Sequence, residues 1–253
     1  ITTPHNTHYN FLKKAIQISM PLWVEKPMVI SIKELLDIRK MMLKNNSFYA
    51  IGYNRSFAPW TNFICNKIKN KITNIKMIIN AGKLPSEHWL LDKKISGGRI
   101  IGEFCHFIDL SISLLKHTFL SDVYCIRRDK YYQDTGDFLL TFNDGSKVEI
   151  NYRSDMPPSI PKEKIIVNSE GVEYVNNNWN KFNKISILGK VKKGKGHEQA
   201  ISLFLNKIKE KKYTSYDEIN HMCFSTYTAI NLQKMKKGDN LKILQNYEKE
   251  IIG

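Results

Sequence analysis

The sequence predicts an α/β protein in two parts. Residues 1–56 are expected to form the end of a parallel sheet, because two short apolar runs flank an amphipathic segment in strand–helix–strand order. Residues 57–253 are expected to form an α+β domain with a large, mostly antiparallel open sheet. In that part, short apolar runs follow one another, and glycine-containing turns join neighbouring runs into hairpins.

In the first part, apolar residues at helical spacing predict a helix over 7–19, followed by a strand that ends near Lys26. Ser31 and Glu34 form a capping-box pattern that predicts the start of a second helix, and residues 48–52 follow as a strand. The residues expected in the core from these helices are Phe11, Leu12, Ala15, Ile16, Ile18, Ile32, Leu35, Leu36, Ile38 and Met42.

In the second part, a helix is expected over 57–69 and another over 98–116, with a strand over 74–79 between them. Further strands are expected at 123–127, 138–142, 147–152, 165–168 and 172–175. The turns Asn143-Asp144-Gly145 and Ser169-Glu170-Gly171 place glycine where a positive φ is needed. Two helices, 197–211 and 216–236, are expected to close the chain.

The composition is that of a globular enzyme part. The chain has 253 residues, of which 42% are hydrophobic and 25% charged, so it can bury a substantial core. No apolar run approaches the roughly 20 residues that cross a bilayer, so no membrane association is expected. The four cysteines are scattered without a Cys-x-x-Cys pair, which indicates reduced thiols, no metal site and a cytoplasmic location.

The net charge of +15 raises the question of nucleic-acid binding. Only six of the 39 basic residues are arginine, and the lysines are spread along the chain. Nucleic-acid-binding modules usually gather their charge in one stripe and favour arginine for bidentate contacts. We therefore expect no nucleic-acid partner, although such a field can steer an anionic substrate.

The most informative stretch is residues 97–109. A glycine pair precedes an apolar helix that carries Glu103, His106 and Asp109 in three-residue steps, so the three side chains lie on adjoining parts of one face. Glycines at the start of such a helix allow a ligand to approach the backbone closely. A buried histidine capped by a neighbour is the structural alternative.

A lysine at a strand end is the second feature. Residues 21–27 read Pro-Leu-Trp-Val-Glu-Lys-Pro, so Lys26 is expected at the carboxyl edge of the sheet, where open α/β sheets bind ligands. Pro27 favours an extended backbone at Lys26. A lysine in a half-buried cleft can donate or accept a proton. A solvated turn lysine is the alternative.

Other polar groups are candidates for the ligand side. Tyr53, Asn54 and Arg55 follow a strand expected beside Lys26, and Arg55 is suited to a phosphate or carboxylate, or to a salt bridge at a domain junction. His88-Trp89 pairs a polar ring with an aromatic platform suited to a sugar, unless Trp89 anchors its loop to the core.

Taken together, the motifs resemble the Gfo/Idh/MocA family of nicotinamide-dependent oxidoreductases, in a branch that includes enzymes of sugars and nucleotide sugars. They are Thr3-Pro4-His5-Asn6-Thr7-His8, Glu25-Lys26-Pro27, Gly52-Tyr53-Asn54-Arg55 with Pro59, Asn80-Ala81-Gly82, His88-Trp89, the stretch 97–109, and Gly196-His197-Glu198-Gln199 with Phe204.

The resemblance implies that residues 1–56 are the C-terminal part of a Rossmann domain, followed by a substrate domain. It implies NAD or NADP as cofactor, a sugar, cyclitol or nucleotide sugar as substrate, and a homo-oligomer formed through the open sheet. The implied catalytic residues are His106, as base, and Lys26. The cofactor would contact Thr3, Pro4, His5, His8, Glu25, Lys26, Pro27, Asn54 and Arg55. The substrate would contact Tyr53, His88, Trp89, Arg99, Glu103, Asp109 and His197.

The chain departs from the family in two places. Many members carry an aspartate four residues before the histidine, where this chain has Gly102, and Glu103 lies about 100° further round the helix. No Gly-x-Gly-x-x-Gly turn is present, which indicates that the N-terminal part of the Rossmann domain is absent and that this segment is inactive by itself. The alternative is a non-catalytic remnant that serves as a binding or oligomerisation module.

Overall fold

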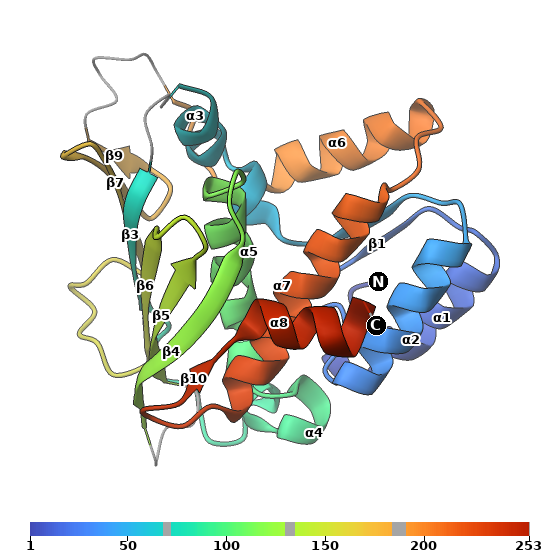
Figure 1. Ribbon diagram of the computed structural model, residues 1–253, viewed down its shortest axis with the longest axis horizontal. Coiled ribbons are helices and arrows are strands. Elements are labelled where there is room, and N and C mark those ends of the chain that lie inside the picture. The colour runs from blue at the N-terminus through green and yellow to red at the C-terminus, as the bar shows by residue number, and fades with distance from the viewer. Residues whose placement is uncertain (68–71, 130–134, 184–190, 253) are drawn as a thin grey trace. The chain divides into compact units, whose positions relative to one another are not determined.

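A computed structural model describes residues 1–67, 72–129, 135–183 and 191–252 (Figure 1). The chain divides into two compact units. Unit 1 contains Ile1–Asn54, Ser86–Asp109 and Glu198–Lys234, and unit 2 contains Arg55–Pro85, Leu110–His197 and Met235–Gly253. The sequence boundary at residue 56 lies close to the first division, whereas two later segments join the N-terminal residues in unit 1.

Unit 1 is built on a small parallel sheet, as predicted. Strands β1 (Leu22–Val24) and β2 (Tyr49–Ile51) pair in parallel with Leu22 opposite Tyr49, and α2 (Ile32–Lys44) connects them. The other elements of this unit are η1 (His5–Thr7), α1 (His8–Gln17), η3 (Trp89–Leu91), α4 (Lys93–Ser96), η4 (Ile100–Phe104), and α7 (Tyr216–Lys234). Helix α6 (His197–Lys209) begins at the last residue of unit 2 and continues in unit 1, and η2 (Asn54–Phe57) begins at the division.

Helix α2 begins as its sequence predicts. The Ser31 hydroxyl accepts a hydrogen bond from the Glu34 amide at 3.3 Å, and the Glu34 carboxylate accepts one from the Ile30 amide at 3.3 Å. These bonds satisfy two amides at the helix start. Leu35, Ile38 and Met42 are buried, so they form the inner stripe of the helix.

Three residues expected in the core are exposed instead. Phe11 is 46% exposed, Ile18 67% and Leu36 39%. The buried stripe of α1 is narrow, since Leu12 and Ile16 alone of its apolar residues are buried, and the helix ends before Ile18. The reason is that both helices have one face toward protein and the other toward solvent.

The packing of unit 1 joins segments far apart in the sequence. Helix α7 packs against α2, where Arg39 donates to Asn220 Oδ1 from Nε and Nη2, at 3.1 and 3.0 Å, and lies over the ring of Tyr216. Phe204 of α6 contacts the rings of Trp23 and Phe48. These contacts anchor α7 to α2 and α6 to the small sheet.

The expected helix over 98–116 is interrupted at its start. Helix α4 ends at Gly97 and Gly98, which adopt positive φ values of 79° and 102°. A π-helical turn, η4, follows, and α5 (Cys105–Leu114) then continues as a regular helix. A side chain at Gly98 would also collide with Gln233, since its Cβ would lie 2.6 Å from the amide oxygen. Glycine is required here both by conformation and by close packing.

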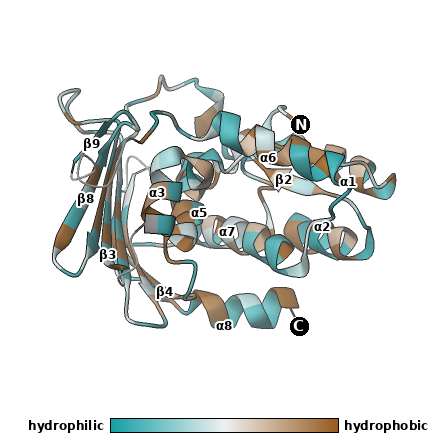
Figure 2. Cartoon of the chain, turned by 90° about the horizontal axis from the view of Figure 1, so that it is seen from above, coloured by the Kyte–Doolittle hydropathy of each residue, from teal (hydrophilic) through white to brown (hydrophobic). Residues whose placement is uncertain are grey.

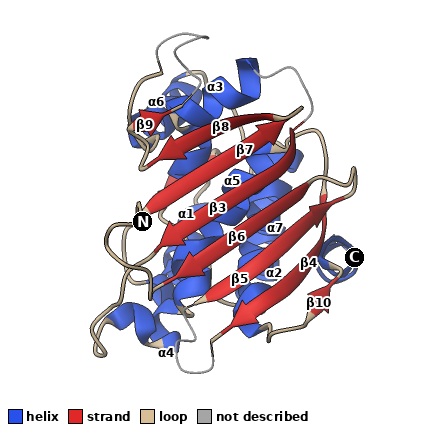
Figure 3. Ribbon diagram, turned by 90° about the vertical axis from the view of Figure 1, so that its left-hand side faces the viewer, coloured by secondary structure: helices blue, strands red, loops and turns tan. Residues whose placement is uncertain are grey.

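Unit 2 contains an eight-stranded sheet in the order β10-β4-β5-β6-β3-β7-β8-β9 (Figure 3). Every neighbouring pair is antiparallel except β3 and β6, which are parallel with Ile75 opposite Val148. The strands are β3 (Ile72–Asn80), β4 (Leu120–Arg128), β5 (Gly136–Phe142), β6 (Lys147–Arg153), β7 (Glu163–Ser169), β8 (Val172–Asn177), β9 (Lys181–Phe182) and β10 (Asn240–Leu241). The predicted large, mostly antiparallel open sheet is thus confirmed.

The strands of this sheet carry both hydrophobic and polar residues (Figure 2), and in β7 every second residue is buried. The helical elements of unit 2 include α3 (Pro59–Lys67), the second half of α5 from Leu110 onward, α8 (Ile243–Tyr247) and η6 (Glu248–Ile252), whereas the first half of α5 belongs to unit 1. Helix α8 packs against β4. One face of the sheet therefore contributes to a core, while the other carries the half-exposed side chains of its strands.

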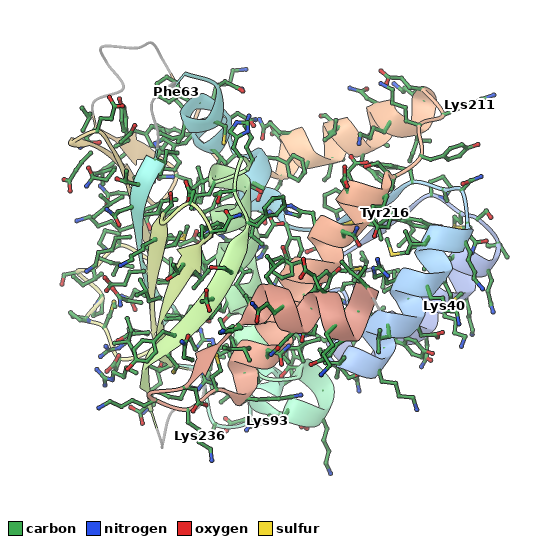
Figure 4. The ribbon with its side chains drawn as sticks, in the orientation of Figure 1. Lys40, Phe63, Lys93, Lys211, Tyr216 and Lys236 are labelled. Carbon is green, nitrogen blue, oxygen red and sulfur yellow. The ribbon has the colours of Figure 1, made fainter. Side chains whose placement is uncertain are left out.

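The cysteines are free, as their spacing predicts, and exposed lysines are found on several elements. All four cysteines are free; Cys105, Cys125 and Cys223 are buried, and Cys65 is partly so. The exposed lysines labelled in Figure 4 lie on separate elements or loops, at 40, 93, 211 and 236. Among the described residues, no helix combines the length and hydropathy that a membrane span requires.

Candidate functional site

Lys26 lies at the end of β1, beside the end of β2, as its place in the sequence predicts. Its Nζ donates a hydrogen bond of 2.6 Å to the backbone carbonyl of Gly102 in η4. The Lys26–Pro27 peptide is cis. This bond brings the lysine of the Glu-Lys-Pro motif to the helix start that carries His106, although 76 residues separate the two partners.

The segment from Thr3 to His8 is held against the Lys26–Pro27 turn. The ring nitrogens of His8, which is fully buried, lie 2.8 Å from the Pro27 carbonyl oxygen and 2.9 Å from that of Thr3. The Thr7 hydroxyl donates to Thr3 Oγ1 at 2.7 Å. Pro4 precedes η1 and is exposed. His8 thus has a positioning role between two loops of unit 1.

His5 lies at the centre of this region. Its Nδ1 is 3.0 Å from the carbonyl oxygen of Ser96, and its ring meets the ring of Trp89 edge to face, with centroids 4.8 Å apart. The ring also covers Gly102. Burial lowers the pKa of His5 to about 4. The hydrogen bond to the Ser96 carbonyl acts in the opposite direction, whereas the charge of Lys26 lowers the pKa further. The imidazole is therefore neutral at neutral pH.

His106 is buried on α5, and its ring lies edge to face with that of Tyr53, with centroids 6.2 Å apart. The Tyr53 hydroxyl is hydrogen-bonded to Thr226 Oγ1 on α7 at 3.1 Å. Complete burial raises the pKa of Tyr53 well above its ordinary value, so the phenol remains protonated. Asn54, next in the chain, is buried as well.

Asp109 has a partner that the sequence did not reveal. Its Oδ1 lies 2.8 Å from Nε2 of His221 on α7. Burial lowers the pKa of His221, but the Asp109 carboxylate outweighs it, and the net pKa is raised. The two residues are 112 positions apart, and a lone histidine in a helix carries no local signal of such pairing.

Glu103 does not take the place of an aspartate at 102. Its carboxylate pairs with Arg99 one turn earlier, and the Arg99 side chain is 2% exposed. Both charges that were expected to face a substrate are therefore engaged with each other. Their spacing in the sequence, four residues apart on a helix, is a signal for this pair.

Glu25 and the His88–Trp89 pair complete the residues of unit 1. The Glu25 carboxylate accepts a hydrogen bond from Trp23 Nε1 at 3.1 Å and lies against the Cα of Gly52. The His88 ring stacks on that of Trp89 at 6.1 Å, and its Nδ1 accepts from the Leu90 amide at 3.2 Å. Trp89 is 41% exposed, so part of its ring is accessible to a ligand.

Two predicted site residues, Arg55 and His197, belong to unit 2. Arg55 donates to both carboxylate oxygens of Glu163, at 2.8 and 2.7 Å, which corresponds to the salt-bridge alternative. Lys195 and the Trp179 indole also donate to Glu163. His197 is exposed at the first residue of α6. Unit 1 thus brings together Lys26, His106 and the other candidates, without these two.

The described residues contain no group of three or more His, Cys, Asp or Glu side chains arranged to hold a metal ion. In the candidate site, Lys26 offers a cationic hydrogen-bond donor, and imidazole rings offer proton acceptors.

Solved structures share this fold, whereas no family model and no curated protein matches the sequence. GenD2 from gentamicin A biosynthesis, solved in complex with NAD, matches with a TM-score of 0.71 at 16% identity, covering 95% of this chain and 76% of its own. The chain has the fold of Gfo/Idh/MocA-type oxidoreductases. The resemblance predicted from the motifs is thus confirmed at the level of the fold.

Two further solved structures with this fold are those of dehydrogenases. A myo-inositol dehydrogenase from Corynebacterium glutamicum has a TM-score of 0.75 at 13% identity, over 94% of this chain and 78% of its own. The UDP-N-acetylglucosamine 3-dehydrogenase GnnA from Acidithiobacillus ferrooxidans has a TM-score of 0.69 at 16% identity, over 91% and 75%. At these identities, the likeness concerns the fold.

Proposed function

We propose that the protein is an NAD(P)-dependent oxidoreductase that acts on a hydroxyl or keto group of a sugar, cyclitol or nucleotide sugar. The observation that carries the proposal is the hydrogen bond from Lys26 to Gly102, four residues before His106 on adjoining helical turns. It joins a sheet-edge lysine to a helix with a buried histidine inside one compact unit. The fold shared with a myo-inositol dehydrogenase and a UDP-N-acetylglucosamine 3-dehydrogenase supports the substrate class.

In the proposed reaction, His106 takes the proton of the substrate hydroxyl. Lys26 donates a hydrogen bond to the same oxygen and stabilises the negative charge that develops there, without changing its own protonation. The Tyr53 phenol, which remains protonated, limits the position of the His106 ring by edge-to-face contact. Asp109, paired with His221, is proposed to contact a second hydroxyl of the substrate.

The residues present fit the nicotinamide side of a cofactor site. Thr3 and Pro4 precede η1, which His5 begins, and His8 at the start of α1 ties this segment to the Lys26–Pro27 turn. Together with Glu25 they surround the carboxyl end of β1, where dinucleotides bind in parallel sheets. A nicotinamide held there would supply the hydride acceptor or donor for the carbon that bears the substrate oxygen. Asn54 remains a proposed cofactor contact, whereas for Arg55 the pair with Glu163 favours a structural role.

The open sheet of unit 2 is the proposed surface for a homo-oligomer. A groove of about 360 Å³ on its exposed face is lined by residues of both charges, which include Lys76, Lys147, Glu149 and Glu173. A surface with both charges is complementary to a second copy of itself in a two-fold interface. Light scattering after gel filtration measures the mass of the particle in solution, and Lys147→Glu should shift that mass toward the monomer.

The free thiols favour the cytoplasm as location.

Calorimetric titration of NAD(H) and NADP(H), followed by assays with myo-inositol and UDP-N-acetylglucosamine, tests the function. The protein is this chain and, where the natural product extends upstream of Ile1, that longer product. Lys26→Ala should lower kcat by about a hundredfold or more, since it removes a charged donor from the reacting oxygen. Lys40→Ala, on the exposed side of α2, is the matched control and should leave kcat unchanged.

If no form of the protein binds either cofactor, the oxidoreductase proposal is wrong. The non-catalytic alternative then leads, since Gly102 in place of an acidic residue already favours it. Binding without turnover of any hydroxyl substrate has the same consequence for the reaction.

A further inference from the structure

The candidate site contains an unusual contact between a histidine and a glycine. A Cβ added to Gly102 would lie 2.8 Å from Cε1 of His5 and 3.3 Å from its Nδ1. Gly102 does not have a positive φ, so its conformation does not call for glycine. The His5 ring occupies the space that any side chain at position 102 would need.

The surroundings of His5 determine its tautomer. The Ser96 carbonyl can only accept a hydrogen bond, so Nδ1 of His5 carries the hydrogen and Nε2 has the lone pair. Within the described part of the chain, Nε2 has no hydrogen-bond partner, and it is not among the fully enclosed polar atoms that lack one. An acceptor that is not fully enclosed is thereby available to a ligand.

The charged and titratable groups around His5 come from three elements. Lys26 follows β1 and His8 begins α1, and both disfavour a proton on His5, whereas Glu103 of η4 favours one. Lys26 and His5 meet at the same residue, because the Lys26 ammonium binds the Gly102 carbonyl while the His5 ring covers the Gly102 Cα. A cationic donor and a neutral acceptor thus lie side by side.

We propose that His5 is a ligand-binding residue of this site, whose Nε2 accepts a hydrogen bond from a hydroxyl of the substrate beside Lys26. The Trp89 ring and the Ser96 carbonyl hold the imidazole in place, and Gly102 provides the space for it. The ligand is a polyol with two neighbouring hydroxyls, one for Lys26 and one for His5. This inference deepens the proposed function and rests on it for the identity of the ligand.

The tautomer is tested without any activity. Nitrogen-15 NMR of histidine-labelled protein, with His5 assigned by its loss in His5→Phe, should show hydrogen on Nδ1 and no titration until the pH falls toward 4. A signal with hydrogen on Nε2, or titration near the ordinary pKa of 6.5, would overturn the proposal.

The pairing of His5 with Gly102 is tested by a thermal-unfolding cycle. Gly102→Ala should lower Tm by about 2–6 °C, and His5→Ala should remove most of that loss when the two are combined. The matched control is Gly52→Ala, whose Cβ would meet Glu25 and whose effect should add to that of His5→Ala without rescue. Additive effects of Gly102→Ala and His5→Ala would contradict the pairing.

The role of Nε2 requires a variant that keeps the ring. His5→Phe fills the same space and lacks the acceptor, so kcat/KM should fall about ten- to a hundredfold. Tm should fall only by the few degrees that follow from loss of the hydrogen bond to the Ser96 carbonyl. His117→Ala, on the exposed loop after α5, should leave both unchanged. Unchanged kcat/KM in His5→Phe would show that His5 only packs. If the wild-type protein turns over no hydroxyl substrate, the proposed function falls and this inference falls with it, whatever the NMR and the cycle show of His5.

Discussion

At the scale of the residue, Glu163 illustrates how a buried charge is maintained. Its side chain is 2% exposed, and Arg55, Lys195 and the Trp179 indole all donate to it. Burial raises the pKa of Glu163, but the two cations outweigh it and the pKa falls to about 2. The carboxylate is stable only because its hydrogen bonds are satisfied.

Replacing Glu163 should therefore destabilise unit 2 strongly. Glu163→Gln removes the charge that Arg55 and Lys195 face, and we expect a loss of about 3 kcal/mol in the free energy of unfolding. Urea denaturation measures it. Glu210→Gln, whose partner Lys212 is exposed as well, is the control and should cost less than about 1 kcal/mol. Equal losses in the two variants would contradict this account.

The pair of Asp109 and His221 should make the free energy of unfolding depend on pH. Because the pKa of His221 is raised in the folded chain, its contribution is fully present below pH 6.5 and is lost as the pH rises through the folded pKa. The difference in unfolding free energy between wild type and His221→Gln should thus shrink between neutral and alkaline pH. A difference that is constant with pH would show that the histidine only packs.

At the scale of the element, the start of α2 shows a local rule at work. Ser31→Ala removes the acceptor for the Glu34 amide, so the protein should lose about 1 kcal/mol of stability. Denaturant unfolding measures it, with Ser31→Asp expected to retain the cap. Arg39 lies beyond the first turn of α2 and binds Asn220 on α7. Fraying of the first turn should therefore leave that contact intact.

The region around η4 shows where local rules stop. The apolar pattern of residues 98–116 predicts one helix, yet two left-handed glycines and a π-helical turn open it. Gln233 of α7 explains this, because its amide oxygen accepts from the Ile100 amide at 3.2 Å and occupies the space beside Gly98. A partner that is distant in sequence reshapes the start of the helix.

At the scale of the whole molecule, the free energy of unfolding should fall in two steps as the pH is lowered. His5 has a lowered pKa, so its contribution is present above pH 6.5 and is lost as the pH falls toward 4; that of Glu163 is lost between pH 4.5 and about 2. Each step should lower the free energy of unfolding by about 3 kcal/mol. Urea unfolding at a series of pH values measures both.

The two groups belong to different units, which provides an internal check. His5→Phe should remove the loss between pH 6.5 and 4 and leave the more acidic one in place. If the first loss persists in His5→Phe, another group is responsible for it.

The sequence alone determined a large part of this protein. Strand–helix–strand order in residues 21–52 and hairpin turns after 123 follow from local periodicity and turn chemistry, which do not depend on distant residues. The place of Lys26 at a parallel strand end follows in the same way, from a short apolar run before a Lys-Pro pair.

Tertiary structure decided the partners. Lys26 with Gly102, His5 with Ser96, and Asp109 with His221 each join residues at least 76 positions apart. It also decided which apolar residues are buried, as exposed Phe11 and Leu36 show. The physical reason is that periodicity specifies a face, whereas hydrogen bonds, burial and pKa depend on what the fold places against that face.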